Sequence, residues 1–172
     1  MTNIKFIEAV KALIGMPYEQ VACDAVIRRA LNINFKGVNW LFRSVNNSSK
    51  YRYITERHAC GDGTTPPPGA VTFKIDESKT PNGYERGPDA YHCGVVDVDG
   101  YVIHSSPKVG VRKDMTSRWT EWDYWGLMKQ VEYNVNVSDE VGDESFDEFN
   151  DYCETLTDRE LLEAIYRAVV KD

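Results

Sequence analysis

Apolar residues recur with a helical period over the first part of the chain. In residues 3–15 they form one stripe, which Asn3 can cap at its start and which Gly15 ends. A second helix is expected over about residues 22–31, with Cys23 on its apolar face and two arginines pointing away. The segment VNWLFRSV predicts a third, shorter helix.

After a loop, CGDGTTPPPG, apolar and polar residues alternate with the period of a β-strand. AVTF is the first strand of this part, HCGVVDV and YVIHSS form a hairpin, and VGVRK and YWGLMKQVEYNV follow as two further strands. A polar loop from Lys74 to about Ala90 precedes the hairpin, and KYRYIT indicates a short strand or an extended segment. Helices followed by an antiparallel sheet define an α+β fold.

The net charge of -7 divides the chain into two regions. Residues 1–135 are nearly neutral, which excludes nucleic acid as the main partner because phosphate binding needs clustered Lys and Arg. Nearly all of the negative charge lies in residues 136–172. We therefore expect one globular domain over residues 1–135 and an acidic C-terminal extension over residues 136–172.

The extension contains TDRE at residues 157–160, a capping box that opens a terminal helix with an apolar edge. That edge favours docking onto the body or onto another copy, and the second case would give a homo-oligomer. A solvated, partly disordered extension is the alternative.

No stretch of the 172 residues is apolar enough to span a membrane, and the start, MTNIKFIEAVKALIG, lacks the pattern of a signal peptide. We therefore expect folding in a cytosol and no membrane insertion. The four cysteines are irregularly spaced and include no Cys-x-x-Cys pair, so neither a disulfide framework nor a zinc knuckle is indicated.

Two loop lengths are possible for the hairpin that carries His92 and His104. A two-residue Asp-Gly loop would put the two histidines on opposite faces of the sheet. A three-residue Val-Asp-Gly loop would pair His104 with Gly94 and bring both imidazoles to one face as diagonal neighbours, with Cys93 on the other face.

Two histidines within hydrogen-bond reach suit a general base and the residue that orients it, although two structural polar residues fit the same pattern. The nucleophile candidate is Cys23, because the first turn of a helix stabilises a thiolate. A thiolate beside an imidazolium is the activated pair of cysteine hydrolases. A buried, unreactive cysteine on a core-facing position is the alternative.

Three segments, in order GMPYEQVACDAVIRRAL, PPPGAVTFK and YHCGVVDVDGYVIHSSPKVGV, resemble the NlpC family of papain-like cell-wall cysteine peptidases. In that family a Gly-x-Pro-Tyr turn precedes a helix that begins with the catalytic cysteine. A strand that begins with histidine then leads through a glycine turn to a second strand ending in Ile-His. The resemblance covers roughly residues 4–130, and the hairpin is its most specific part.

The resemblance implies a papain-like fold in which Cys23 is the nucleophile, His92 the general base and His104 the residue that orients it. It also puts Tyr18 and Asp24 in the substrate and oxyanion region, where the backbone N–H of the nucleophile would be a first oxyanion donor.

The chain departs from the family pattern around the nucleophile. The family usually has Asp-Cys-Ser-Gly there, whereas this chain has Ala-Cys-Asp-Ala, and Ala70 stands where the family has a strand aspartate. Such departures are typical of a divergent member of the kind found in bacteriophage genomes.

The resulting prediction is a cysteine endopeptidase or amidase with a Cys-His-His triad and no cofactor, acting on stem or cross-bridge peptides of peptidoglycan. A phage endolysin, present in the host cytoplasm before release to the cell wall, and a lysin carried on the virion tail both fit this prediction. The alternatives are a thiol amidase or acyltransferase on another substrate and a non-catalytic phage module that keeps the fold.

Two other clusters in the sequence could carry a function. His58, Cys60, His92 and Cys93 have poor spacing for tetrahedral zinc, and His58 is expected in an exposed loop. The aromatic segment RWTEWDYW could line a glycan groove, but packing against the sheet is favoured.

Overall fold

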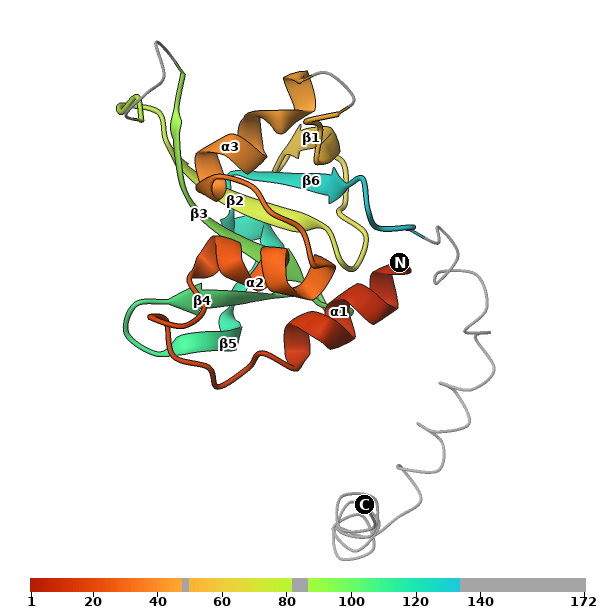
Figure 1. Cartoon of the computed structure of the whole chain (residues 1–172). Helices are drawn as coiled ribbons and strands as arrows, with labels where there is room; N and C mark the ends of the chain where they lie inside the picture. The colour runs from red at the N-terminus through yellow and green to blue at the C-terminus, as the bar shows by residue number, and fades with distance from the viewer. Residues whose placement is uncertain (48–49, 82–86, 134–172) are drawn as a thin grey trace, which may run out of the picture. The chain divides into compact units, whose positions relative to one another are not determined.

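The structure is a computed structural model that describes residues 1–47, 50–81 and 87–133 (Figure 1). The helical elements are α1 (Asn3–Lys11), α2 (Cys23–Leu31), α3 (Gly37–Arg43) and the short 3-10 helix η1 (Ser44–Asn46). The strands are β1 (Ile54–Ala59), β2 (Val71–Asp76), β3 (Asp89–Val96), β4 (Tyr101–Ser106), β5 (Gly110–Arg118) and β6 (Tyr124–Met128), with the 3-10 helix η2 (Trp119–Glu121) before β6.

The strands form one antiparallel sheet in the order β1-β6-β2-β3-β4-β5. Helices α1, α2 and α3 cover one face of this sheet (Figure 1). The core between the two layers contains Phe6, Val26 and Leu41 from the helices and Phe73, Val95 and Ile103 from the strands. The predicted α+β class, with N-terminal helices packed on an antiparallel sheet, is confirmed.

The hairpin between β3 and β4 has the three-residue loop. Gly94 pairs with His104, and the N–H of Asp97 donates to the carbonyl oxygen of Tyr101 at 2.8 Å. Gly100 adopts the left-handed conformation (φ 79°) that this loop type requires. Of the two registers that the sequence allowed, the structure has the one that brings both histidines to the same face.

The first helix is shorter than its apolar stripe predicted, because the chain leaves the helix to bond to β5. The N–H of Gly15 donates to the carbonyl oxygen of Val111 at 2.9 Å, and the N–H of Val111 donates to Met16 at 2.9 Å. The cap is also different from the expected Asn3, since the hydroxyl of Thr2 accepts the N–H of Lys5. Helix α1 therefore ends at Lys11 rather than at residue 15.

The strand before the CGDGTTPPPG loop begins later in the chain than KYRYIT suggested, at Ile54. It includes His58, which lies opposite Trp125 of β6 and stacks on its ring with centroids 4.3 Å apart. The prediction that His58 lies in an exposed loop was therefore wrong. Strands β6 and β2 lie between β1 and β3, so the sheet also separates His58 from His92.

A buried carboxylate ties the hairpin loop to two other elements. Asp97 is fully buried, and its oxygens lie 2.8 Å from Nζ of Lys11 on α1 and 2.7 Å from Nζ of Lys113 on β5. Because both lysines approach from neighbouring elements, this cluster fixes α1 and β5 relative to the start of the loop.

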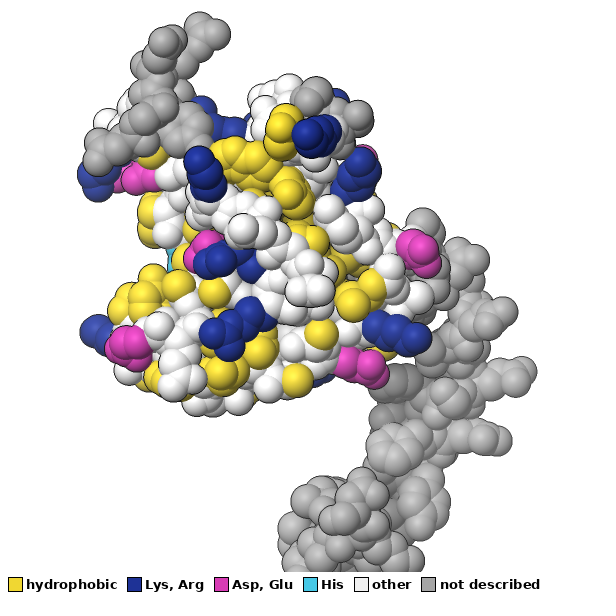
Figure 2. All heavy atoms as spheres, viewed as in Figure 1, with side chains coloured by type: hydrophobic (Ala, Val, Ile, Leu, Met, Phe, Trp, Pro, Cys, Tyr) yellow, Lys and Arg dark blue, Asp and Glu magenta, His cyan; other side chains and the backbone are white. Residues whose placement is uncertain are grey.

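The acidic extension over residues 136–172 and its predicted terminal helix lie outside the described residues. Within residues 1–47, 50–81 and 87–133, no helix combines the length and the apolar character that crossing a membrane requires. Figure 2 shows that Lys and Arg side chains are scattered over the face that the helices cover rather than gathered in one area.

Candidate active site

Cys23 is the first residue of α2 and is 6% exposed. The residue before it, Ala22, is extended and makes no side-chain cap, so the helix begins directly at the cysteine. The buried hydroxyl of Ser105 on β4 donates to the carbonyl oxygen of Val21. This hydrogen bond holds the start of α2 against the strand that also carries His104.

Strands β3 and β4 run apart beyond Gly94, as Figure 1 shows. Their pairing extends from Val96–Val102 to Gly94–His104, and the described residues include no further pair toward the start of β3. In the preceding part of the strand, His92 and Cys93 pair only with β2 in the described structure. Cys23, at the start of α2, hydrogen-bonds with the side chains of both Cys93 and His92, which point to opposite faces of β3 because they are consecutive strand residues.

The surroundings of Cys23 lower the pKa of its thiol. A hydrogen bond from the side chain of Cys93 is the largest cause and, together with the ring and charge of His92, lowers the pKa of Cys23 to about 5 although burial opposes the shift. The same hydrogen bond and full burial raise the pKa of Cys93 well above its ordinary value. Cys23 is therefore the thiolate of the pair, and Cys93 is a neutral hydrogen-bond donor to it.

The two imidazoles are in direct contact. Nε2 of His92 lies 2.8 Å from Nδ1 of His104, and the ring planes meet at 84°. His104 is 9% exposed, and burial together with the neighbouring His92 lowers its pKa. His104 is accordingly a neutral partner that orients the His92 ring.

Trp122 packs against both rings from the side of the sheet that the helices leave open. Its indole stacks on His92 with centroids 5.4 Å apart and meets His104 edge to face at 5.9 Å. The indole is buried, and its Nε1 donates to the hydroxyl of Ser117 at 3.1 Å. The aromatic segment thus serves packing, as favoured from the sequence, but the packing includes the imidazole pair itself.

A carboxylate lies next to the second imidazole. Oδ2 of Asp114 on β5 lies 3.5 Å from Nε2 of His104, at the opposite end of the ring from His92. Neither Asp114 nor Trp122 was predicted from the sequence as a site residue. The alternation of β5 was a usable signal for Asp114, because Arg112 pairs with His104 and residue 114 lies on the same face two positions along.

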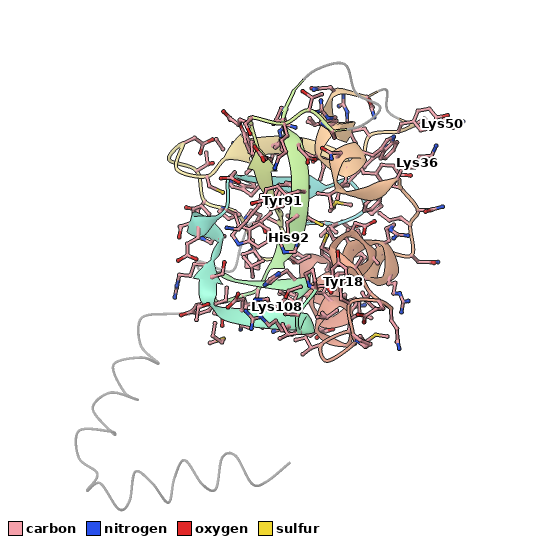
Figure 3. All side chains as sticks on the ribbon, turned by 90° about the vertical axis from the view of Figure 1, so that its left-hand side faces the viewer. Tyr18, Lys36, Lys50, Tyr91, His92 and Lys108 are labelled. Carbon is pink, nitrogen blue, oxygen red and sulfur yellow. The ribbon has the colours of Figure 1, made fainter. Side chains whose placement is uncertain are left out.

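The two remaining predicted site residues differ in their surroundings. Tyr18 is half-buried, and burial together with the negative charge of Cys23 raises its pKa. Figure 3 looks onto this side of the molecule, with His92 between Tyr91 and Tyr18 in the view. Asp24 pairs with Arg28 one turn along α2 at 3.0 Å, and its charge contributes to the raised pKa of Tyr18 and of Cys93.

A hollow of about 540 Å³ lies elsewhere, between α3 and the segment that leads into β1. It is lined in part by Asn34, Lys36, Trp40 and Tyr53 and contains none of the residues around Cys23. The chemistry of the cysteine and the histidines is therefore separate from this hollow.

No family model and no curated protein matches the chain. Among solved structures, the chain is similar to the crystal structure of the NlpC/p60 domain of peptidoglycan hydrolase SagA, with a TM-score of 0.47 and 16% sequence identity. The match covers 74% of this chain and 100% of that chain.

Proposed function

We propose that the protein is a cysteine peptidase or amidase that hydrolyses amide bonds in bacterial peptidoglycan peptides. The observation that carries this proposal is the hydrogen bond between Cys23, whose pKa is lowered, and His92, whose Nε2 lies 2.8 Å from Nδ1 of His104. An activated sulfur beside a ring that can carry a proton is what amide hydrolysis through an acyl-enzyme needs.

The reaction begins with attack of the Cys23 thiolate on the substrate carbonyl carbon, which forms a C–S bond and places negative charge on the carbonyl oxygen. The backbone N–H of Cys23, at the N-terminal end of α2, is the first donor to that oxygen. The protonated His92 then gives its proton to the leaving amine, the C–N bond breaks, and an acyl-enzyme remains. His92 next takes a proton from water, the hydroxide attacks the thioester, and the carboxylic acid and the thiolate are released.

The peptidoglycan substrate follows from the resemblance of the hairpin and of the GMPYEQVAC segment to the NlpC family. The amide bond in question belongs to a stem or cross-bridge peptide. The biological setting that we propose is a phage endolysin, present in the host cytoplasm before release to the cell wall, or a lysin of the virion tail.

The test is a zymogram of the full chain against purified peptidoglycan, followed by mass spectrometry of the released fragments. Cys23→Ala is the variant expected to be inactive, and Cys60→Ala is its matched control. Cys60 directly follows β1, which is separated from β3 and its His92 by β6 and β2. Clearing by the wild type and by the Cys60 variant but not by the Cys23 variant supports the proposal. Clearing that survives Cys23→Ala overturns the mechanism, and absence of clearing by the wild type overturns the peptidoglycan substrate.

A further inference from the structure

Strand β5 presents a carboxylate to the outer nitrogen of the imidazole pair. Nε2 of His104 has one acidic neighbour among the described residues, Oδ2 of Asp114 at 3.5 Å, and both side chains are largely buried, with 11% and 13% exposed. At 3.5 Å the contact is an ion-pair distance rather than a short hydrogen bond. Its influence on the ring is therefore mainly electrostatic.

The position of this carboxylate is fixed by three other contacts. Oδ1 of Asp114 accepts the N–H of Thr116 at 3.1 Å and its hydroxyl at 2.7 Å, and Oδ2 accepts Nη2 of Arg112 at 2.9 Å. Burial raises the pKa of Asp114, but the hydrogen bonds from Thr116 and Arg112 outweigh it and hold that pKa well below its usual range. Asp114 is consequently an anion under all conditions in which the thiol could act.

We infer that Asp114 is a positioning residue that fixes the tautomer of His104 and, through it, the tautomer of His92. The inference rests on the proposed function in that it concerns the same catalytic site. Asp114 does not touch the reacting atoms, because two imidazoles stand between it and the sulfur.

The tautomers follow from the donor and acceptor capacity of each group. A carboxylate only accepts, so the single N–H of neutral His104 belongs on Nε2, facing Asp114. Nδ1 of His104 is then an acceptor, and the proton in the 2.8 Å contact belongs to Nε2 of His92. Nδ1 of His92 keeps its lone pair, which makes it the nitrogen that takes the proton of the thiol.

A change of tautomer in one ring alone would place two lone pairs or two N–H groups against each other. Without the Asp114 charge, both rings can change together: Nδ1 of His104 then donates to Nε2 of His92, the His92 proton moves to Nδ1, and no lone pair of His92 is left to face the sulfur. Protonated His92, which stabilises the Cys23 thiolate, also becomes less stable when the negative charge of Asp114 is removed.

Other charged and titratable groups also face the site. His104 is adjacent to His92, Arg112 and Asp114. Cys23 is adjacent to His92, Cys93 and Tyr18, and the charge of Asp24 acts on both Cys93 and Tyr18, while that of Arg28 acts on Cys93. Asp114 supplies a negative charge to the outer end of the imidazole pair, so its removal has a defined direction: the thiolate becomes less stable.

The test uses the full chain and the variant Asp114→Asn, which keeps the size of the side chain and removes its charge. Its matched control is Asp76→Asn. Asp76 has the same local arrangement, with Oδ1 accepting the N–H and hydroxyl of Ser78 and Oδ2 paired with Lys79 at 2.7 Å, but it faces no histidine among the described contacts.

The first readout is the pH dependence of Cys23 alkylation by iodoacetamide, followed by mass spectrometry. We expect the labelling midpoint of Asp114→Asn to move upward by about one pH unit and that of Asp76→Asn to stay at the wild-type value. We also expect turnover of peptidoglycan by Asp114→Asn to fall at least about tenfold, mainly in kcat, as part of the roughly 10²- to 10⁴-fold that a positioned base contributes. A labelling profile of Asp114→Asn that coincides with the wild-type profile overturns the inference.

The second readout needs no variant, so it holds even if Asp114→Asn fails to fold. Nitrogen-15 NMR of the wild-type imidazoles distinguishes the tautomers, and we expect neutral His104 to carry its proton on Nε2. A proton on Nδ1 overturns the inference. The two proposals can fail separately. If the wild type cleaves no peptidoglycan but shows this tautomer and an Asp114-dependent labelling midpoint, the proposed function is wrong and the role of Asp114 is still supported.

Discussion

Nε2 of His92 and Nδ1 of His104 lie 2.8 Å apart, with their rings nearly perpendicular. Each ring thus offers the other one nitrogen and keeps its second nitrogen for a different partner, Cys23 on one side and Asp114 on the other. Cys23 on α2, His92 on β3, His104 on β4 and Asp114 on β5 therefore follow one another in a row. In the proposed reaction, the central contact of this row is the hydrogen bond between His92 and His104.

Replacement of His104 tests that central contact. His104→Asn places an amide oxygen close to where Nδ1 of the imidazole lies, so it can still accept the N–H of His92, whereas His104→Ala cannot. We expect the Ala variant to lose about 10²- to 10⁴-fold in kcat and the Asn variant to lose clearly less. Equal activity of the two variants would show that orientation of His92 does not depend on this hydrogen bond.

The cysteines should differ widely in their reactivity toward alkylating reagents. The pKa of Cys23 is lowered to about 5, chiefly by its hydrogen bond with Cys93, whereas burial raises the pKa of Cys60 to about 11. Between pH 6 and 8 Cys23 is therefore the thiolate, and its labelling rate should fall as the pH drops through about 5. Mass spectrometry of the labelled peptides gives the rates, and equal, slow labelling of Cys23 and Cys60 would contradict an activated thiol.

The Asp97 cluster should contribute to stability rather than to catalysis. Asp97→Asn leaves Lys11 and Lys113 without the buried charge that they pair with, and we expect a loss of about 2–4 kcal/mol in the free energy of unfolding. Asp99→Asn is the matched control, because Asp99 is 41% exposed in its pair with Lys113 and should cost less than about 1 kcal/mol. Urea unfolding measures both, and equal losses would show that burial of Asp97 is not the cause.

The same cluster gives the folded protein a pH dependence with a definite sign. The hydrogen bonds and charges of the two lysines outweigh burial and lower the pKa of Asp97 below its ordinary value of 3.8. Its contribution to stability is therefore complete above that value and is lost as the pH falls through the lower folded-state pKa. The stability difference between the wild type and Asp97→Asn should accordingly shrink in strongly acidic solution.

Gly94 should not tolerate a side chain. An added Cβ would lie 2.4 Å from Cγ1 of Val102 and 3.1 Å from Cβ of His104, and both neighbours are buried. We expect Gly94→Ala to lose about 1–3 kcal/mol of stability and to lower turnover, because relief of the contact displaces His104. Thermal unfolding and the zymogram measure the two effects. Wild-type stability and activity in this variant would mean that the strands can separate without disturbing the site.

The parts of the site that could be predicted from the sequence depend on local pattern. The apolar period of the second helix placed Cys23 in its first turn, and the Val-Asp-Gly loop was one of two registers that the sequence allowed. The contact between Cys23 and Cys93 could not be predicted in this way. The alternation of side chains along β3 correctly puts Cys93 and His92 on opposite faces of the strand. The side chain of Cys23 nevertheless hydrogen-bonds with both residues.

Asp114 was missed because the strand predicted from VGVRK ended at Lys113, although the regular pairing of β5 with β4 continues to Asp114 opposite Val102. Trp122 follows the short helix η2, so its position does not follow from a strand period. The end of α1 was misplaced for a similar reason, since Gly15 gives its N–H to Val111, a residue almost a hundred positions along the chain.

The hydrogen bond between Ser105 and Val21 has a mechanical consequence. Ser105 follows His104 directly on β4, and Val21 precedes Cys23 by two residues, so this one strand holds both the start of α2 and His104. A displacement of β4 therefore acts on Cys23 and on His104 together, whereas His92 is carried separately by β3.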